Sequence, residues 1–373
     1  MMNKDSLGLY IHIPFCVRKC RYCDFCSFPI TEDARAQYVT ALVSEIEHAQ
    51  TDARKVDSIF FGGGTPSLLS VDEFRRVISA VVDRFFVASD AEITVEMNPG
   101  TVTKEKLSAM CALGVNRVSM GLQSAHNSEL SSLGRIHTYE QFLESLSLVR
   151  ESGIENVNVD LMYAIPGQTA ESFRETLERV IALSPSHISA YSLILEEGTP
   201  LYNERESLSF PSEEEEEIMY RMACEMLGNA GYLHYEISNY AKEGKICRHN
   251  LRYWQGGDYL GFGISAHSLY HGERLAKTED LASYLCDPFS YENREIRDKN
   301  AEEEEYIMLS LRTSFGISLD ACRTRFGRDL LSEKKDIIDL LKRQGLLSVD
   351  RDRLFLTERG FYLSNAIICE LLQ

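Results

Sequence analysis

Short apolar stretches alternate with longer amphipathic ones along the first 240 residues. Leu9, Ile11 and Ile13 alternate with other side chains, which is typical of a β-strand. Helices are expected over 34–50 and from Ser70 to about residue 86, where Glu73 completes a capping box. Five further strands are expected at 56–61, 91–96, 117–121, 156–162 and 187–195. Six strand–helix units in succession imply an α/β fold with a parallel sheet, either an open barrel or a doubly wound sheet.

The pattern changes after residue 240. Residues 241–299 contain a glycine-rich stretch and the single tryptophan, and we interpret them as a linker with a distinctive loop. Residues 300–373 read as two helices, a hairpin and a final helix, which predicts a small winged-helix-like domain. Residues 301–373 hold 11 Lys and Arg against 13 Asp and Glu, so this domain is not expected to bind phosphate backbones. The expected domains are therefore 1–240, 241–299 and 300–373.

The net charge of the chain limits the classes of partner that it is expected to bind. The formal net charge is −18, which argues against nucleic acid or an anionic membrane as the main partner. The sequence contains no run of about 18 apolar residues, so no transmembrane helix is expected. The first residues lack a signal-peptide pattern, so we expect a cytoplasmic protein. The ten cysteines are then expected to serve metals or the core instead of disulfides.

Three of those cysteines stand close together directly after the first strand. Cys16, Cys20 and Cys23 form C-x3-C-x2-C, and thiolates are the ligands that iron–sulfur clusters take. Three protein ligands on a [4Fe–4S] cluster leave one iron open, and an open metal position is where a substrate or cofactor binds. The alternative is a zinc site with Cys26 or His12 as the fourth ligand.

Polar residues also follow the ends of successive strands. Glycines 62–64 end the second strand, Glu96 the third and Gln123 the fourth, while Asp160 lies within an otherwise apolar fifth strand. Carboxyl ends of parallel strands meet at one edge, so these residues favour a shared polar ligand. A buried carboxylate such as Asp160 is costly unless it is paired or hydrogen-bonded. For the glycines alone, a simple sharp turn is the alternative.

A second unusual stretch is C-R-H-N-L-R-Y-W at 247–254. His249 has a ring nitrogen that suits a metal, and the neighbouring aromatic residues suit a flat macrocycle. Arg248 or Arg252 could pair with carboxylate groups of such a macrocycle. The alternative is a loop packed over the barrel, with His249 hydrogen-bonded for structural reasons.

The motifs together resemble a known family. The C-x3-C-x2-C loop is similar to the signature of the radical S-adenosylmethionine (SAM) superfamily, and the whole chain resembles its HemN-like branch, which comprises haem chaperones and oxygen-independent coproporphyrinogen III oxidases. The resemblance runs nearly end to end, through YIHIPFC, FFGGGTPSLL, EMNPGT, VNRVSMGLQS, LGRIHT, VDLMYAIPGQT, AYSLILEEGTPLY, YEISNYA and HNLRYW-x-GGDYLGFG-x-x-AHS. It implies an incomplete (β/α)6 TIM-like barrel.

The resemblance also implies cofactors and site residues. Cys16, Cys20 and Cys23 would hold the [4Fe–4S] cluster, and His249 would belong to a motif linked to haem binding. Tyr22 precedes the third cysteine, where the family has an aromatic residue near a second SAM. The remaining SAM positions match Tyr10, Gly63, Gly64, Thr65, Glu96, Gln123, Arg135 and Asp160.

Two departures separate the chain from the oxidases. Phe25 occupies the position of a fourth cysteine, with Cys26 one residue late, and only nine residues precede Tyr10. These differences, with the motif around His249, favour a haem chaperone over an enzyme that decarboxylates coproporphyrinogen III. Such a chaperone would hold the cluster, SAM and haem, and would pass haem to an unidentified acceptor protein.

Overall fold

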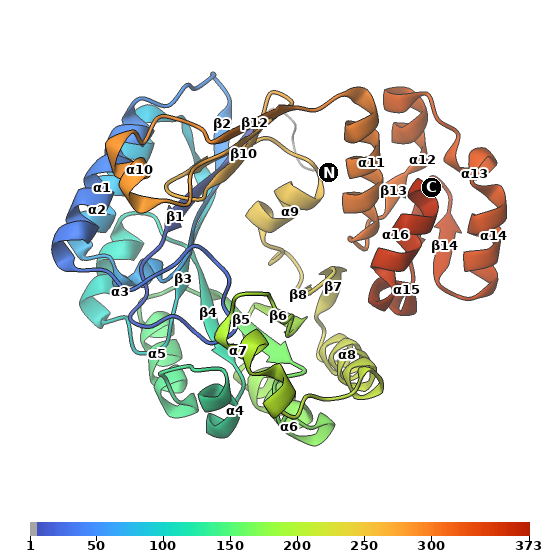
Figure 1. Ribbon diagram of the computed structural model, residues 1–373, viewed down its shortest axis with the longest axis horizontal. Coiled ribbons are helices and arrows are strands. Elements are labelled where there is room, and N and C mark those ends of the chain that lie inside the picture. The colour runs from blue at the N-terminus through green and yellow to red at the C-terminus, as the bar shows by residue number, and fades with distance from the viewer. Residues whose placement is uncertain (1–5) are drawn as a thin grey trace.

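A β-sheet of twelve strands organises residues 6–296 (Figure 1). The computed structural model describes residues 6–373. The strand order is β12-β11-β10-β9-β1-β2-β3-β4-β5-β6-β8-β7. The first six strands are β1 (Ser6–Ile13), β2 (Lys55–Gly63), β3 (Val87–Met97), β4 (Arg117–Gln123), β5 (Asn156–Tyr163) and β6 (His187–Ser192). Neighbours among them pair in parallel and in the order of the sequence, which confirms the predicted parallel sheet.

Helices connect these strands and lie around the outside of the curved sheet (Figure 1). Ser70 and Glu73 form the predicted capping box at the start of α2. The acidic run at 213–217 begins α8, where negative charge complements the helix dipole. The helices are α1 (Glu32–Glu47), α2 (Val71–Arg84), α3 (Lys104–Ala112), α4 (Asn127–Ser132), α5 (Tyr139–Glu151), α6 (Ala170–Leu183), α7 (Pro200–Asn203) and α8 (Glu213–Asn229), with 3-10 turns at Pro66–Leu68 and Arg205–Ser207.

The sheet curves like a barrel but remains open. On the side away from β2, β1 pairs with β9 (Tyr259–Phe262). At the other end of the six strands, β6 pairs with β8 (Asn239–Ala241), and β8 pairs with β7 (Leu233–Glu236). The strands β1 and β6 therefore do not pair with each other, and the barrel is not closed. This arrangement confirms the incomplete TIM-like barrel. Leu9 and Ile11 of β1 are fully buried in its core.

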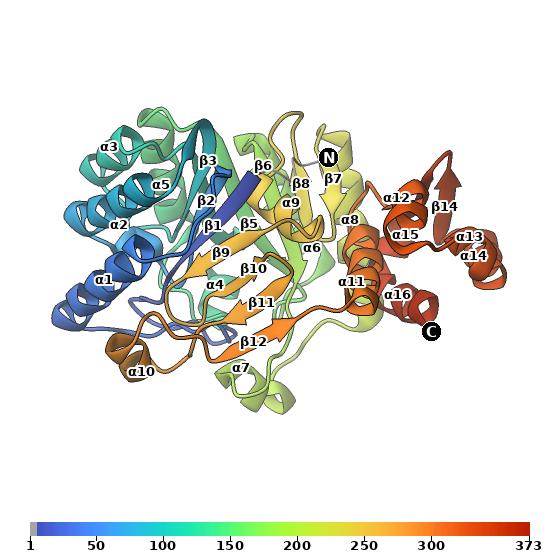
Figure 2. The ribbon, with the colours of Figure 1, turned by 90° about the horizontal axis from the view of Figure 1, so that it is seen from above.

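Residues 241–299, which we interpreted as a linker, extend the main sheet (Figure 2). They form α9 (Arg248–Trp254), β9, β10 (His267–Tyr270), β11 (Glu273–Ala276), α10 (Leu281–Cys286) and β12 (Asn293–Ile296). A buried ion pair joins this segment to α1, with Nζ of Lys277 at 3.0 Å from Oε1 of Glu45. The segment is thus packed onto the barrel, while the domain boundaries at 240 and 299 stay a prediction.

The last segment forms a separate small sheet with helices around it (Figure 1). Its hairpin of β14 (Leu347–Asp350) and β15 (Arg353–Leu356) confirms the predicted one, and β13 (Ile317–Ser318) adds a third strand. Its helices are α11 (Lys299–Leu311), α12 (Leu319–Ala321), α13 (Leu330–Glu333), α14 (Lys335–Arg343), α15 (Glu358–Tyr362) and α16 (Ser364–Leu372), with a π-helical turn at Cys322–Phe326. Within residues 6–373, no helix has the length and apolar character needed to cross a membrane.

Candidate functional site: the cysteine loop and two adjoining cavities

The loop with the predicted cluster ligands is closed at its base and anchored at its tip. The backbone N–H of Phe28 donates to the carbonyl of Pro14 at 2.9 Å, and that of Cys16 donates to the carbonyl of Phe28 at 3.1 Å. At the tip, the N–H of Arg21 donates to the carbonyl of Leu133 at 3.1 Å. The loop is thereby held over the carboxyl ends of the parallel strands.

Each of the three cysteines has a polar group beside its sulfur. Sγ of Cys16 lies 3.7 Å from the hydroxyl of Thr65, and Sγ of Cys20 lies 3.6 Å from Nη1 of Arg135. Sγ of Cys23 lies 3.9 Å from the hydroxyl of Ser27. Hydroxyl and guanidinium donors stabilise thiolates, the form that binds metal.

Cys16, Cys20 and Cys23 are free thiols on one loop. In a [4Fe–4S] cubane each thiolate binds a different iron, so three thiolates occupy three of the four irons. The donor set of this loop therefore fits a [4Fe–4S] cluster with one open iron.

Below the loop lies a cavity of about 520 Å³, here called the cluster cavity. It brings together most of the residues predicted for the cluster and SAM. These lining residues are Cys16, Cys20, Tyr22, Cys23, Gly63, Gly64, Glu96, Gln123, Arg135 and Asp160. Thr65 lies behind Cys16, and Tyr10 and His249 lie outside this cavity.

The glycines at the end of β2 are required by close packing. Gly63 has a φ of +108°, and a Cβ there would come within 2.5 Å of the His12 ring. A Cβ on Gly64 would come within 2.7 Å of the carbonyl oxygen of Phe15. The glycines therefore let β2 meet the base of the cysteine loop.

Two partly buried carboxylates face the cluster cavity. Oε2 of Glu96 accepts a hydrogen bond from the N–H of Gly63 at 3.1 Å. Burial, and then the nearby Asp160, raise the pKa of Glu96 to about 8. Asp160 accepts from Nδ2 of Asn158 at 2.7 Å and from the hydroxyl of Ser119 at 3.2 Å, and burial raises its pKa. The pair can receive a cation or several hydroxyl groups.

Arg135 is a partly buried cation of the cluster cavity. Its Nη2 donates to Oδ1 of Asn98 and to the carbonyl of Gly121, both at 2.6 Å. Asn98 in turn donates from Nδ2 to the hydroxyl of Thr65 at 2.7 Å. The sequence analysis missed Asn98, although it stands in the EMNPG stretch two residues after Glu96.

Gln123 adopts a strained backbone where β4 ends. Its φ is +74°, which is uncommon for a residue with a side chain. Oε1 of Gln123 accepts a hydrogen bond from the hydroxyl of Tyr191 at 2.9 Å. Strain of this kind is characteristic of residues at functional sites. Tyr191, Ser119 and Asn158 were also missed, because a lone polar residue in a strand carries no motif.

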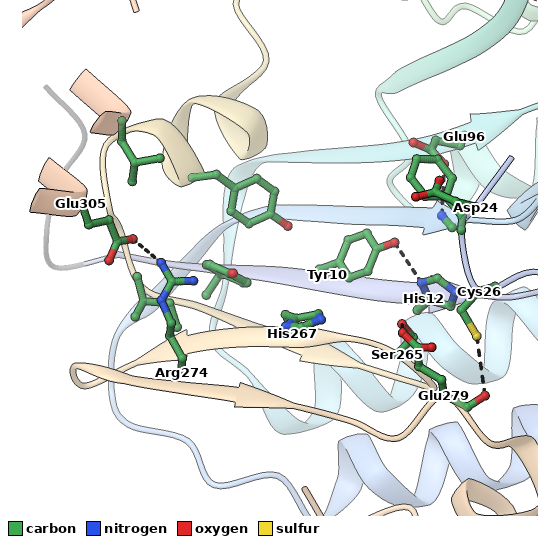
Figure 3. A pocket seen from close by; sticks show the side chains of 16 residues that line it. Tyr10, His12, Asp24, Cys26, Glu96, Ser265, His267, Arg274, Glu279 and Glu305 are labelled. Carbon is green, nitrogen blue, oxygen red and sulfur yellow. Dashed lines mark hydrogen bonds and ion pairs between the residues drawn. The ribbon is translucent and has the colours of Figure 1, made fainter. Parts of the chain in front are cut away.

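A second cavity of about 530 Å³, here called the outer cavity, adjoins the first (Figure 3). The two share Asp24, Phe25, Gly63 and Glu96 as lining residues. Tyr10 faces the outer cavity, and its hydroxyl lies 3.0 Å from Nδ1 of His12. Nε2 of His12 lies 2.9 Å from the carbonyl oxygen of Cys26, so Tyr10 helps to fix the end of the cysteine loop.

His249 lies in the interior, with both ring nitrogens engaged. Its Nδ1 lies 3.1 Å from the hydroxyl of Ser58, and its Nε2 lies 2.7 Å from the hydroxyl of Tyr253. Burial, followed by the charges of Arg252 and Arg117, lowers its pKa to about 3. This environment matches the structural alternative considered for His249, and iron binding there requires one of these contacts to break.

Comparison with known protein families agrees with this architecture. The description "Radical SAM superfamily" matches residues 10–180, and "HemN C-terminal domain" matches residues 298–363. In solved structures, the chain is similar to coproporphyrinogen III oxidase (HemN) from Escherichia coli, with a TM-score of 0.85 and 24% identity. That match covers 98% of this chain and 90% of the oxidase chain. At 24% identity it is evidence for the fold alone.

Curated relatives extend the comparison to sequence. The heme chaperone HemW of Lactococcus lactis subsp. lactis is 34% identical over 371 residues, which cover 98% of this chain and 97% of that protein. HemW of Bacillus subtilis is 34% identical over 96% of this chain and 97% of its own length. HemW of Escherichia coli is 40% identical over 72% of this chain and 71% of its own length.

The open parallel barrel and the cysteine loop over its carboxyl edge define a radical SAM protein. A domain of this class implies a [4Fe–4S] cluster and SAM, and the cysteines and polar lining of the cluster cavity fit both. The chain belongs to the HemW family.

Proposed function

We propose that the protein is a haem chaperone, which binds haem beside a [4Fe–4S] cluster and SAM and passes haem to an acceptor protein in the cytoplasm. The observation that carries this proposal is the end-to-end similarity to relatives named heme chaperone HemW. The two adjoining cavities support it, because one contains the cluster cysteines and the other offers room for a further ligand.

In this proposal Cys16, Cys20 and Cys23 bind the cluster. When bound, the cluster supplies an iron with an open coordination position and a source of single electrons. The hydroxyl of Thr65 and the guanidinium of Arg135 lie beside two of these sulfurs and hold them in place.

The polar lining of the cluster cavity receives SAM. Glu96 and Asp160 suit the ammonium and hydroxyl groups of SAM, while Arg135 suits its carboxylate. Gln123 and Tyr22 complete the lining, and the glycines at 63–64 leave the backbone accessible. Tyr10 stands behind this site through His12, so its predicted contact with SAM stays a prediction.

The test compares haem transfer with porphyrinogen oxidation. Protein with a reconstituted cluster is loaded with haem, mixed with an apo haem protein and followed by the acceptor's absorbance. Transfer faster than from free haem supports the chaperone. The same protein is incubated anaerobically with SAM, a reductant and coproporphyrinogen III. Protoporphyrinogen formed over many turnovers would make the protein an oxidase instead.

A further inference from the structure

The outer cavity has the composition of a site for a flat, largely apolar ligand with charged edges. Its walls come from strands β1, β2, β3 and β9 to β11, from α9 and α11, and from the cysteine loop (Figure 3). We propose that this cavity binds haem and that His267 supplies the ligand to the haem iron. This inference rests on the proposed haem chaperone function and assigns the site within it.

His267 is the histidine of this cavity with a free ring. It lies on β10, its side chain is exposed, and within residues 6–373 its ring makes no hydrogen bond, ion pair or ring contact. By contrast, both ring nitrogens of His12 and of His249 already have partners. Haem iron is held by a neutral imidazole nitrogen, which His267 can offer without breaking a contact.

Aromatic and aliphatic side chains form the walls beside His267. Tyr10, Tyr253 and Tyr259 line the cavity together with Leu269. The rings of Tyr253 and Tyr259 pack edge to face with centroids 4.5 Å apart. Broad aromatic walls suit the faces of a macrocycle.

The buried His249 has a place in this arrangement. Its Nε2 lies 2.7 Å from the hydroxyl of Tyr253, and its ring stacks beside that of Tyr10 with centroids 6.4 Å apart. His249 therefore positions two walls of the outer cavity. On this account the H-N-x-x-Y-W motif serves haem binding by building the wall, and His267 provides the iron ligand.

The charges along the cavity orient the ligand. Figure 3 shows Arg274 and Glu305 at one end, Asp24 and Cys26 at the other, and His267 between them. Oε1 of Glu305 lies 2.5 Å from Nη2 of Arg274, and its Oε2 lies 2.8 Å from Nη1 of Arg297. Two guanidinium groups thus face one carboxylate, and a positive charge remains for the haem propionates. The acidic opposite end repels them.

The experiment is a titration of ferric haem into full-length protein with a reconstituted cluster, followed by the haem absorbance after subtraction of the cluster spectrum. His267→Ala should weaken haem binding at least tenfold and shift the main haem band. The matched control is His271→Ala, an exposed histidine on the next turn that does not line the cavity. This control should bind haem like the wild type.

Arg274→Gln tests the orientation independently. It should weaken binding of haem but leave binding of haem dimethyl ester unchanged, because the ester lacks the propionate charges. Unchanged affinity and spectrum in His267→Ala would overturn the inference while wild-type binding upholds the chaperone. Absence of haem binding by the wild type would instead overturn the proposed function. Cluster absorbance and circular dichroism confirm that each variant is folded.

Discussion

Nη2 of Arg135 donates to Oδ1 of Asn98 at a distance of 2.6 Å. This hydrogen bond connects the segment after β4 with the segment after β3, inside the cluster cavity. The same nitrogen donates to the carbonyl of Gly121, and the neighbouring Nη1 reaches Sγ of Cys20. One partly buried guanidinium thereby joins two strand ends to the cysteine loop.

Replacing Arg135 should lower stability measurably. Arg135→Met leaves Oδ1 of Asn98 and the carbonyl of Gly121 without their donor, and we expect the free energy of unfolding to fall by about 2–4 kcal/mol. Urea denaturation of the cluster-free protein measures this change. Arg135→Lys keeps one charged donor and should lose less. Equal stability of both variants and the wild type would contradict the role given to this side chain.

The raised pKa of Glu96 predicts how stability depends on pH. The pKa is about 8 in the folded protein, against an ordinary value of 4.5. Between these values the folded state binds more protons than the unfolded state, so stability is lost as pH rises towards 8. We expect a slope of up to about 1.4 kcal/mol per pH unit from this group.

Urea unfolding of cluster-free protein between pH 5.5 and 8.5 measures that slope. Glu96→Gln keeps an acceptor for the N–H of Gly63 but carries no titrating proton. Its unfolding free energy should therefore depend less on pH, and it should equal or exceed that of the wild type at pH 8.5. An identical pH profile in the two proteins would show that Glu96 does not titrate in this window.

The cysteine loop offers a matched pair of variants for the cluster. Cys20→Ala should abolish the brown cluster absorbance after anaerobic reconstitution, because one of three thiolate ligands is gone. Cys26→Ala should retain it, since Sγ of Cys26 lies in the outer cavity, 3.9 Å from the carbonyl of Glu279. Chemical analysis of iron and sulfide measures how many of these atoms each chain holds. A full cluster in Cys20→Ala, or none in Cys26→Ala, would require another ligand set.

The buried ion pair between Lys277 and Glu45 is a stability determinant that does not involve the cluster cysteines. Glu45 also accepts hydrogen bonds from the hydroxyl of Tyr284 at 2.7 Å and the N–H of Gly263 at 2.9 Å. Lys277→Met leaves this carboxylate buried without its cation, and we expect a loss of about 3–5 kcal/mol.

Chemical denaturation of Lys277→Met tests this loss directly. Adding Glu45→Gln removes the stranded charge, so the double variant should regain part of the stability. Two losses that simply add would contradict a direct interaction between the side chains.

The sequence pattern predicted the six parallel strands because they are buried on both faces, whereas the choice of an incomplete barrel came from the family resemblance. Residues such as Leu9 and Ile11 belong to short apolar runs whose spacing leaves little choice of structure. The short strands β9 to β12 were missed, because each has only four residues, too few for a clear alternating pattern. Their place in the sheet depends on pairing with β1, which is distant in sequence.

The residues of the cluster cavity were predicted from their positions at the ends of strands. The sequence left two alternatives open for the environment of His249. Carboxyl ends of neighbouring strands meet by topology, so Glu96 and Asp160 were expected together. A motif does not reveal whether a ring nitrogen already has a partner, and for His249 those partners are Ser58, 191 positions away, and Tyr253. His267 belongs to the AHS stretch of the resemblance, where it was only a fallback to His249, and its exposed ring in the outer cavity makes it the better candidate.

The pairing of β9 with β1 has a consequence for biosynthesis. Residues at 8–11 find their partners at 259–262, so about 250 residues must be synthesised before that edge is covered. Until then the nascent chain exposes the hydrogen-bonding edge of an apolar strand, and such edges promote aggregation. The strand also leads directly into the cysteine loop. The sheet edge next to the cluster-binding loop is therefore completed only late in synthesis, after most of the chain has been made.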